Sequence, residues 1–397
     1  MREGWVETTL GDVITIERSR IDPRKLAPDS IYVGLENLES GRPTLGSFGR
    51  LGDIASSATP FVPDDVLFGK LRPYLRKVAI AEVSGFSTTE LLVMRATSQL
   101  LPRFLLYLAT QPSTFRYCEA ASAGTRMPRV SAKDLSAIAV TLPPLAEQRR
   151  IVDVIESVDN YIAALETRAE TARTARSALL HNLLSNPGPD WTKTKFGEVA
   201  QFVRGPFGRS LKKSIFVDAG YAVYEQQHAI SGDLAEARYF IDQEKFDSMQ
   251  RFHLLPKDII MSCSGTVGRV AIAPEELARG VINQALLKVS ANPSVNPHYL
   301  YTWMSSDWFQ REIGANKGGG VQQNITSVAV LKKIPISVPP LAIQIEISEI
   351  ADTTGNQIAA LFAYSNKLRN LRSALLSDLL SGNHEIPTSY DELLGAA

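Results

Sequence analysis

The residues best placed to do chemistry in this chain are short clusters of basic and polar side chains, and the chemistry that they favour is binding to nucleic acid. The densest cluster brings four cations and an aromatic ring into one segment, comprising Lys70, Arg72, Tyr74, Arg76 and Lys77. Arginine can grip phosphates or bond guanine with two hydrogen bonds, and lysine favours phosphate. Alternate spacing on a strand would place these side chains on one face, which predicts a candidate DNA-contacting edge. A strand edge that is merely solvated is the alternative.

Other loops combine donors and acceptors that suit DNA. A second basic loop holds Arg126, Arg129 and Lys133, and its counterpart later in the chain offers Lys317, Gln322, Gln323 and Asn324 after three glycines. Glutamine and asparagine suit adenine. A loop with two glycines, which permit close backbone approach, carries Ser264, Thr266 and Arg269. A further cluster near Phe207 comprises Arg204, Arg209, Lys212 and Lys213. Plain turns and solvated charged loops remain the alternatives.

The residue sets that catalysis needs are missing from the sequence. A methyltransferase would need an Asn-Pro-Pro-aromatic motif and a glycine-rich cofactor loop, but the Pro-Pro pairs here are followed by leucine. A metal-dependent nuclease needs paired carboxylates with a nearby lysine, and neither Glu-x-Lys nor Asp-x-Lys occurs. The histidines are scattered, at positions His181, His228, His253, His298 and His384. We therefore expect no catalytic residue, no metal site and no cofactor in this chain.

Composition indicates a protein with more than one core. The chain has 397 residues, 44% of them hydrophobic, and its 42 basic residues balance 42 acidic ones. Zero net charge argues against coating nucleic acid by bulk electrostatics, although local basic surfaces remain open. The two cysteines, Cys118 and Cys263, belong to no metal or disulfide pattern, and no long apolar run suggests a membrane span. We expect a soluble, cytoplasmic protein with reduced thiols and no membrane partner.

The sequence contains an internal repeat that spans most of the chain. The segment 4–13 returns as 190–199, and 162–185 returns as 358–381 in register to the last residue. Such a duplication fixes the architecture before any single element is placed. Within each copy, short β-type runs alternate with turns, and helical stretches are expected near 102–122 and 297–315. The predicted organisation is a first block 1–143, a central helix 144–185, a second block 186–338, a distal helix 339–381 and a flexible C-terminal tail 382–397.

Each predicted long helix carries apolar residues at alternating four-three spacing, the coiled-coil pattern. The first seam comprises Ile151, Ile155, Val158, Ile162, Leu165, Ala169, Ala172, Leu179 and Leu183, and the second comprises Ile347, Ala351, Ile358, Leu361, Leu368, Leu375 and Leu379. Arg176 and Arg372 interrupt the seams at matching places. Because one helix enters the second block and the other leaves it, we expect antiparallel packing. The predicted fold class is α+β, with two mixed α/β domains joined by two long antiparallel coiled-coil helices in a pseudo-two-fold internal repeat.

A seam from Ile151 to Leu183 would be about 50 Å long at about 1.5 Å per residue, while turns of B-DNA repeat about every 34 Å. Such helices could hold two DNA readers over neighbouring stretches of one duplex. Two repeated domains on a coiled coil could equally form a scaffold that never touches DNA.

The repeated motifs resemble those of the specificity subunits of type I restriction-modification systems. They are the entry Trp-x-x-x-x-Leu/Phe-Gly-Asp/Glu-Val, the runs DVLFGKLRPYLRKVAIA (65–81) and DIIMSCSGTVGRVAIA (258–273), and the exit LPPLAEQRRI (142–151). The resemblance covers nearly the whole chain. It implies two target recognition domains that bind an asymmetric bipartite DNA site, in a subunit without catalysis of its own.

The resemblance also implies partners. We expect two modification subunits that use S-adenosylmethionine, and motor and nuclease subunits that use ATP and magnesium. Residues at the starts of the two helices are predicted to contact them: Pro143, Pro144, Glu147, Gln148, Pro339, Pro340 and Gln344. Ile343 stands where the first copy has Glu147, so the two helices could contact partners unequally. The competing hypothesis is a coiled-coil scaffold or adaptor without DNA binding.

Overall fold

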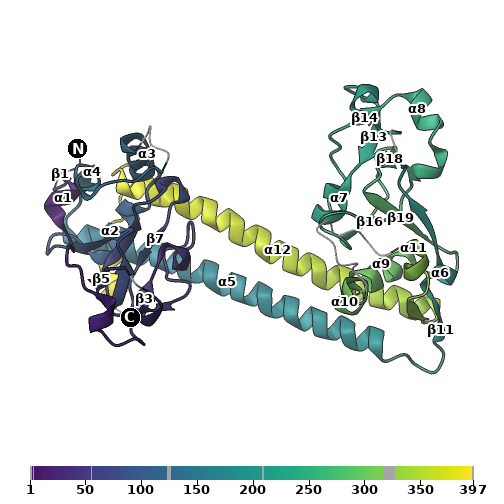
Figure 1. Ribbon diagram of the computed structural model, residues 1–397, viewed down its shortest axis with the longest axis horizontal. Helices are drawn as coiled ribbons and strands as arrows, with labels where there is room; N and C mark the ends of the chain where they lie inside the picture. Colours follow the sequence, from purple (N-terminus) through teal and green to yellow (C-terminus); the bar gives the residue numbers. More distant parts are fainter. Residues whose placement is uncertain are drawn as a thin grey trace. The chain divides into compact units, whose positions relative to one another are not determined.

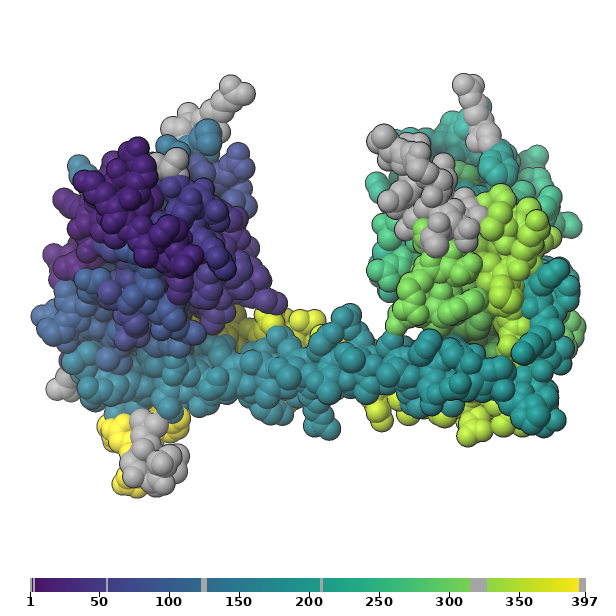
Figure 2. Space-filling model, turned by 60° about the horizontal axis from the view of Figure 1, so that its bottom comes forward, coloured from purple at the N-terminus to yellow at the C-terminus, as the bar shows by residue number. Residues whose placement is uncertain are grey.

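A computed structural model of the chain describes residues 2, 4–54, 56–122, 127–207, 210–315 and 327–395 (Figure 1). It divides into two compact units. Unit 1 is Met1–Leu165 with Tyr364–Ala397, and unit 2 is Glu166–Ala363. Each unit contains one recognition block and one stretch of each long helix. The block of unit 1 rests along its stretch of the first helix (Figure 2).

The unit 1 block has two four-stranded sheets and a two-stranded ribbon. The first sheet has the order β2-β9-β6-β7, formed by Ile14–Ile16, Leu91–Ala96, Val66–Gly69 and Val78–Ile80. The second has the order β4-β3-β8-β5, formed by Gly49–Arg50, Ile31–Val33, Gly85–Thr88 and Ala58–Phe61. The ribbon pairs β1 (Val6–Thr9) with β10 (Ala139–Leu142). The helices are α1 (Leu10–Val13), α2 (Pro102–Ala109), α3 (Pro112–Ala121) and α4 (Ala132–Ser136), with 3₁₀ turns η1 (Pro23–Lys25), η2 (Leu35–Asn37), η3 (Leu51–Asp53) and η4 (Pro73–Leu75).

The unit 2 block repeats this topology. Its sheets have the orders β12-β19-β16-β17 (Ala200–Arg204, Leu286–Ala291, Ile259–Ser262, Val270–Ile272) and β14-β13-β18-β15 (Phe240–Ile241, Tyr221–Tyr224, Gly280–Ile282, His253–Leu254), and β11 (Thr192–Lys195) pairs with β20 (Pro335–Val338). The helices are α6 (Phe196–Val199), α7 (Gln226–Ser231), α8 (Gln243–Asp247), α9 (Pro297–Ser305), α10 (Asp307–Ala315) and α11 (Val328–Leu331), with 3₁₀ turns η5 (Lys213–Ile215) and η6 (Gln250–Phe252).

The central sheet of unit 1 is a buried middle layer. Val66 and Phe68 of β6 join the core that α2 covers, whereas Leu67 between them joins the core on the second sheet's side. Successive side chains of a strand point to opposite faces, so a strand covered on both faces reads as a continuous apolar run. The run DVLFG (65–69) therefore lacks the polar alternation of a surface strand. The loop that follows β6 starts from this buried strand.

The helical stretches expected near 102–122 and 297–315 are each two helices rather than one. In unit 1 the break falls at Thr110–Gln111, just before Pro112, which takes the first position of α3. Proline is tolerated there because a first-turn backbone donor has no intrahelical partner. In unit 2 the break falls at Ser306, whose hydroxyl accepts a hydrogen bond from the Phe309 amide.

The two long helices are α5 (Leu145–Ser185) and α12 (Leu341–Leu380), close to the predicted spans 144–185 and 339–381. In unit 1 the start of α5 packs against the end of α12, with Ile151 and Ile155 in one core with Leu376 and Leu379. In unit 2 the start of α12 shares a core with the end of α5, through Ile347 and Leu184. The helices are antiparallel in each unit, as expected.

The predicted seam is wrong at Leu179, near the end of α5, whereas the predicted Leu379 of α12 is buried. Leu179 was assigned to the seam but is 41% exposed, while its neighbour Leu180 is only 6% exposed. In α12, Leu376 is likewise more buried than the predicted Leu375. A straight helix with 3.6 residues per turn drifts away from a 3.5-residue repeat. The drift brings Leu180 and Leu376 to the buried face instead.

Both interrupting arginines have partners on the facing helix. In unit 1 the guanidinium of Arg372 donates two hydrogen bonds, each 2.7 Å long, to the carboxylate of Asp159. In unit 2 Arg176 donates to the Ala351 carbonyl and the Thr354 hydroxyl. The residue that aligns with Asp159 is Gly355, so the ion pair exists in only one unit.

The segment after α12 differs from the expected flexible tail. In unit 1, Ile386 is buried in the core and α13 (Tyr390–Gly395) begins beside α5. Arg150 Nη1 lies 2.8 Å from Asp391 Oδ2, and the Tyr390 hydroxyl donates to Asp153. Burial of Ile386 and these polar contacts hold the segment in place. The sequence of this segment alone does not show these contacts.

No helix of the described chain is long and apolar enough to cross a membrane. Among the described residues, no cluster of histidine, cysteine, aspartate or glutamate has the arrangement of a metal site. Cys118 and Cys263 are free and buried. Burial raises the pKa of Cys118 to about 11 and that of Cys263 to about 12.

Candidate nucleic-acid interface

The basic segment 70–77 of unit 1 is a structured loop and not a strand. Strand β6 ends at Gly69, and the turn η4 follows. Arg72 and Arg76 flank this turn in the left-handed conformation, with φ of 53° and 49°. The prediction that alternate spacing puts these side chains on one strand face is therefore wrong. Pro73 is the reason, because its fixed φ and missing donor favour a turn over strand continuation.

Hydrogen bonds hold the loop in place. The amide of Arg72 donates to the Pro128 carbonyl at 2.8 Å, and the amide of Val130 donates to the Lys70 carbonyl at 3.0 Å. Lys77 is not a free cation, because its Nζ donates to the Leu35 carbonyl at 2.6 Å. The Arg76 guanidinium lies 5.8 Å from the centre of the Phe115 ring in α3. The loop thus joins η2, α3 and residues 128–130 into one rigid surface.

Several predicted residues lie together on this surface. Arg72, Tyr74, Arg76 and Arg129 are exposed and Lys70 is half-buried. Arg129 forms an ion pair with Glu90 at 3.2 Å. Lys133 is exposed on α4, and Arg126 lies outside the described residues. Sequence reasoning missed Arg116 and Tyr117, which are exposed on α3 beside Phe115. Only the packing of α3 against η4 brings them here. We call this set the unit 1 basic surface: Lys70, Arg72, Tyr74, Leu75, Arg76, Arg116, Tyr117 and Arg129.

The matching loop of unit 2, between β16 and β17, is built differently. Ser262 is buried, and its hydroxyl donates to the Thr266 carbonyl at 2.6 Å and accepts from the Arg269 amide at 2.9 Å. Gly268 has φ of +91°, and a Cβ there would lie 2.4 Å from Ile313. The tip at Gly265 and Thr266 is exposed, as is Arg269, whereas Ser264 is half-buried. This loop presents backbone and the Thr266 hydroxyl at its tip, with one exposed cation, Arg269, at its end.

The remaining candidates in unit 2 are dispersed. Arg204 is half-buried at the end of β12, and its Nη1 has no hydrogen-bond partner within the part of the chain that the structure describes. Lys212 and Lys213 are exposed around η5. Arg209 and the polar run Lys317, Gln322, Gln323 and Asn324 lie outside the described residues. DNA binding by these residues, as by the other candidates of both units, stays a prediction.

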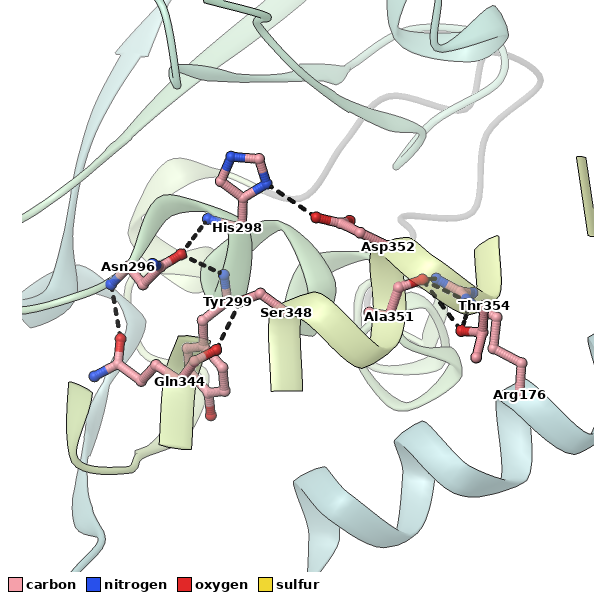
Figure 3. Close-up of polar contacts among 9 residues, drawn as sticks. All are labelled: Arg176, Asn296, His298, Tyr299, Gln344, Ser348, Ala351, Asp352 and Thr354. Atoms are coloured by element: carbon pink, nitrogen blue, oxygen red, sulfur yellow. Dashed lines mark hydrogen bonds and ion pairs between the residues drawn. The ribbon is translucent and has the colours of Figure 1, made fainter. Parts of the chain in front are cut away.

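At the start of each long helix, a glutamine ties the helix to the recognition block. In unit 1, Gln148 Oε1 accepts a hydrogen bond from the Leu101 amide at 2.9 Å, and Nε2 donates to the Gln99 and Pro143 carbonyls at 3.0 Å each. In unit 2, Gln344 Oε1 accepts from the Asn296 amide at 2.7 Å, and Nε2 donates to the Pro339 carbonyl at 2.8 Å and to the Ser294 carbonyl at 3.4 Å (Figure 3). We call each arrangement a glutamine clamp.

Glu147 extends the junction in unit 1 alone. Its carboxylate accepts from the Trp5 indole at 2.9 Å and pairs with Arg2 at 2.8 Å, and Arg2 also pairs with Glu385. The aligned residue in unit 2, Ile343, is 37% exposed. Glu147, Gln148 and Gln344 thus have their polar partners inside the chain. Pro143 and Pro339 are buried and Pro144 and Pro340 are exposed. Contact of these residues with a partner subunit stays a prediction.

Comparison with known proteins decides the family. A family model described as the type I restriction modification DNA specificity domain matches residues 2–172 and 189–368. The chain belongs to the type I restriction-modification specificity family. It carries the domain twice, which confirms the resemblance found in the repeated motifs.

Two relatives illustrate the span of the match. A putative type I restriction enzyme MjaX specificity subunit of Methanocaldococcus jannaschii is 21% identical over 416 residues, 97% of this chain and 95% of the relative. The type I restriction enzyme EcoDI specificity subunit of Escherichia coli is 26% identical over 160 residues, 40% of this chain and 36% of the relative.

Solved structures share the fold. A chain from a study of complex assembly and conformational transition of the type I R-M system matches with a TM-score of 0.65 at 22% identity, covering 96% of this chain and 98% of that one. The type I S subunit from M. genitalium matches with a TM-score of 0.57 at 14% identity, covering 95% and 96%. The predicted α+β fold with two mixed domains and long helices is confirmed.

A second contact in each specificity domain links the block's helix to the long helix. In unit 1, Arg103 of α2 pairs with Glu156 of α5 at 3.0 Å. In unit 2, His298 Nδ1 of α9 lies 3.3 Å from Asp352 of α12 (Figure 3). These pairs occupy matching places in the repeat, about two helical turns beyond the glutamine clamps. The clamp and the pair together set the position of each recognition block on its helix.

Proposed function

We propose that this chain is the DNA specificity subunit of a type I restriction-modification complex, and that its two units read the two parts of an asymmetric, bipartite DNA site. The observation that carries the proposal is the specificity domain, present twice, with an exposed and rigidly held loop at the same place in each copy. Phosphate contacts would fix the register on the duplex, and contacts to base edges would read the sequence.

The chemistry of the two loops supports an asymmetric site. The unit 1 basic surface offers arginines and aromatic rings, which suit phosphate, guanine and base stacking. The unit 2 loop offers glycine backbone and the Thr266 hydroxyl, which suit close approach to the sugar-phosphate backbone. Two copies of one fold with different contact groups would select different base sequences.

The proposed complex assigns catalysis to other subunits. Two modification subunits would bring S-adenosylmethionine, and restriction subunits would bring ATP and magnesium, in the cytoplasm. This chain would position them and hold no cofactor itself. We predict that the exposed residues Pro144 and Pro340, which directly precede α5 and α12, contact the partner subunits together with the neighbouring helix turns. A scaffold without DNA affinity is the disfavoured alternative.

Base-resolved methylation mapping tests the proposal. The chain is coexpressed with its modification subunit, and host DNA is compared with DNA from a host that lacks this chain. We expect one new split motif that is methylated only when both proteins are present. Replacing block 1–143 by that of a relative should change one half of the motif and leave the other intact. A stable complex that produces no new motif would contradict the proposal and favour the scaffold.

A further inference from the structure

The turn between Arg72 and Arg76 places two large side chains at an exposed tip. Tyr74 is 51% exposed and Leu75 is 37% exposed. Pro73, the first residue of the turn, is buried and anchors it. Apolar groups at the tip of a soluble domain face water at some cost unless they meet a partner. Their position between two exposed arginines is therefore the feature to explain.

The turn is rigid and strained. Left-handed backbone at a non-glycine residue is unfavourable and persists only where the surroundings hold it. Here two such residues occur four positions apart. The Arg72 amide is fixed to Pro128, and the Leu75 and Arg76 amides donate back into the turn, to the Arg72 and Pro73 carbonyls at 2.8 and 2.9 Å. The side chains of Tyr74 and Leu75 are consequently presented before any ligand arrives.

The charge around the tip selects a polyanion. Lys70, Arg72 and Arg129 lie on the same surface, and Glu90, the carboxylate next to them, is paired with Arg129. Proteins that distort DNA insert leucine, phenylalanine, isoleucine or methionine between base steps, and aromatic side chains stack on bases. Unstacking a base step is unfavourable, so an inserted side chain is most effective when it is held in place in advance.

We infer that Tyr74 and Leu75 form an apolar wedge that unstacks a base step in the DNA contacted by unit 1, and that unit 2 contacts its DNA without this distortion. The inference rests on the proposed function, because it requires the unit 1 basic surface to face a duplex. Specificity at the wedged step then includes the sequence dependence of duplex deformation.

Unit 2 provides the internal contrast. At the corresponding tip the chain has Gly265 and Thr266, and Val267 beside them is half-buried. No large apolar side chain projects from this described loop. Its glycines allow close approach of backbone to DNA but supply nothing to insert between bases. This loop of unit 2 therefore has no counterpart of the Tyr74–Leu75 wedge, and the inference assigns that wedge to one half of the bipartite site.

The test uses the full chain in complex with its modification subunit and duplexes of the mapped site. Single purines are replaced by 2-aminopurine, whose fluorescence rises when it is unstacked. Any base that the mapping finds methylated is excluded, because its extrusion for chemistry would give a rise of its own. We expect a several-fold rise at one step of the first half-site. Tyr74→Ala and Leu75→Ala should abolish it and weaken binding by about 5- to 150-fold, as loss of one stacking contact does.

Matched variants separate the wedge from folding. Tyr74→Phe keeps the ring and should keep the rise, and Val62→Ala removes an equally exposed aliphatic side chain elsewhere in the block. Thr266→Ala tests the loop of unit 2. A bound duplex with no rise, or a rise that survives both alanine variants, would overturn the wedge and leave the proposed function intact. Equal rises in both half-sites would overturn the asymmetry. Absence of selective binding by the unaltered complex would overturn both proposals.

Discussion

The glutamine clamps make a quantitative prediction about stability. Gln148→Leu keeps a side chain of similar size but removes three hydrogen bonds, from the Leu101 amide and to the Gln99 and Pro143 carbonyls. The Gln148 side chain is 1% exposed, so water cannot replace the lost partners without opening the junction. A net 0.5–1.5 kcal/mol per bond, with part of the desolvation cost of orphaned groups, gives about 2–4 kcal/mol. Gln344→Leu should cost a similar amount in unit 2.

Hydrogen exchange measures this loss where it occurs. We expect the Leu101 amide to exchange about 30- to 1,000-fold faster in Gln148→Leu, since each 1.4 kcal/mol is a factor of ten, while the Asn296 amide keeps its rate. Gln344→Leu should show the reverse. Gln201→Leu, an exposed position on β12, is the control and should change stability by less than about 0.5 kcal/mol.

Gln148 would not stabilise the junction if Gln148→Leu unfolds in denaturant with the same free energy as Gln201→Leu. The same conclusion would follow if the Leu101 amide keeps its protection from exchange. In either case the packing of Ile151 and Ile155, and not the hydrogen bonds of Gln148, would stabilise the junction. Faster exchange in both units from a single substitution would show that the junctions are not independent.

Three further predictions concern the helices and the thiols. Gly355→Asp should supply Arg176 with the carboxylate that Asp159 gives Arg372, because the three atoms nearest to a Cβ at Gly355 all belong to Arg176, with Nη2 at 3.6 Å. Thermal unfolding at pH 7 should favour Gly355→Asp over Gly355→Asn by about 0.5–1 kcal/mol. An advantage that persists unchanged at pH 2 would contradict the ion pair. Cys118 and Cys263 should resist iodoacetamide at pH 8 in the folded chain and react once the chain is unfolded. Burial raises the pKa of Cys118 to about 11 and that of Cys263 to about 12, which disfavours the reactive thiolate. Alkylation of either thiol in the native protein, detected by mass spectrometry, would contradict this prediction. Removing one heptad from both α5 and α12 should change the length of the spacer in the methylated motif and keep the sequences of its two halves. Methylation mapping that found altered halves would refute the idea that helix length sets the spacer.

Periodic features of this chain could be read from the sequence because one physical rule produces each of them. The four-three apolar spacing required long helices, and α5 and α12 run almost as predicted. The repeat required the same fold twice, and the strand orders agree. Even here the rule had a limit: the seam beyond Arg176 follows the straight helix and buries Leu180 in place of Leu179.

The candidate DNA-binding loop of unit 1 could be located from the sequence, but its conformation could not be predicted. Its cations were identified, yet the loop is held by bonds from the Arg72 amide to the Pro128 carbonyl and from the Val130 amide to the Lys70 carbonyl, which no local pattern shows. Lys77 was counted with the binding residues although it caps the Leu35 carbonyl. Arg116 and Tyr117 were missed because α3 is distant in sequence from η4. Each error concerns a contact between segments far apart in the chain.

The composition of the two units has a consequence for synthesis on the ribosome. Unit 2 is one continuous stretch of chain, whereas unit 1 combines Met1–Leu165 with Tyr364–Ala397. Its core joins Ile151 and Ile155 to Leu376 and Leu379. The roughly 200 residues in between take on the order of 10–40 s to translate at about 5–20 residues per second. During that time the first block has emerged but its helix lacks a partner, so the unit that begins first is completed last, and a premature stop near the 3′ end of the message would damage the domain encoded at the 5′ end.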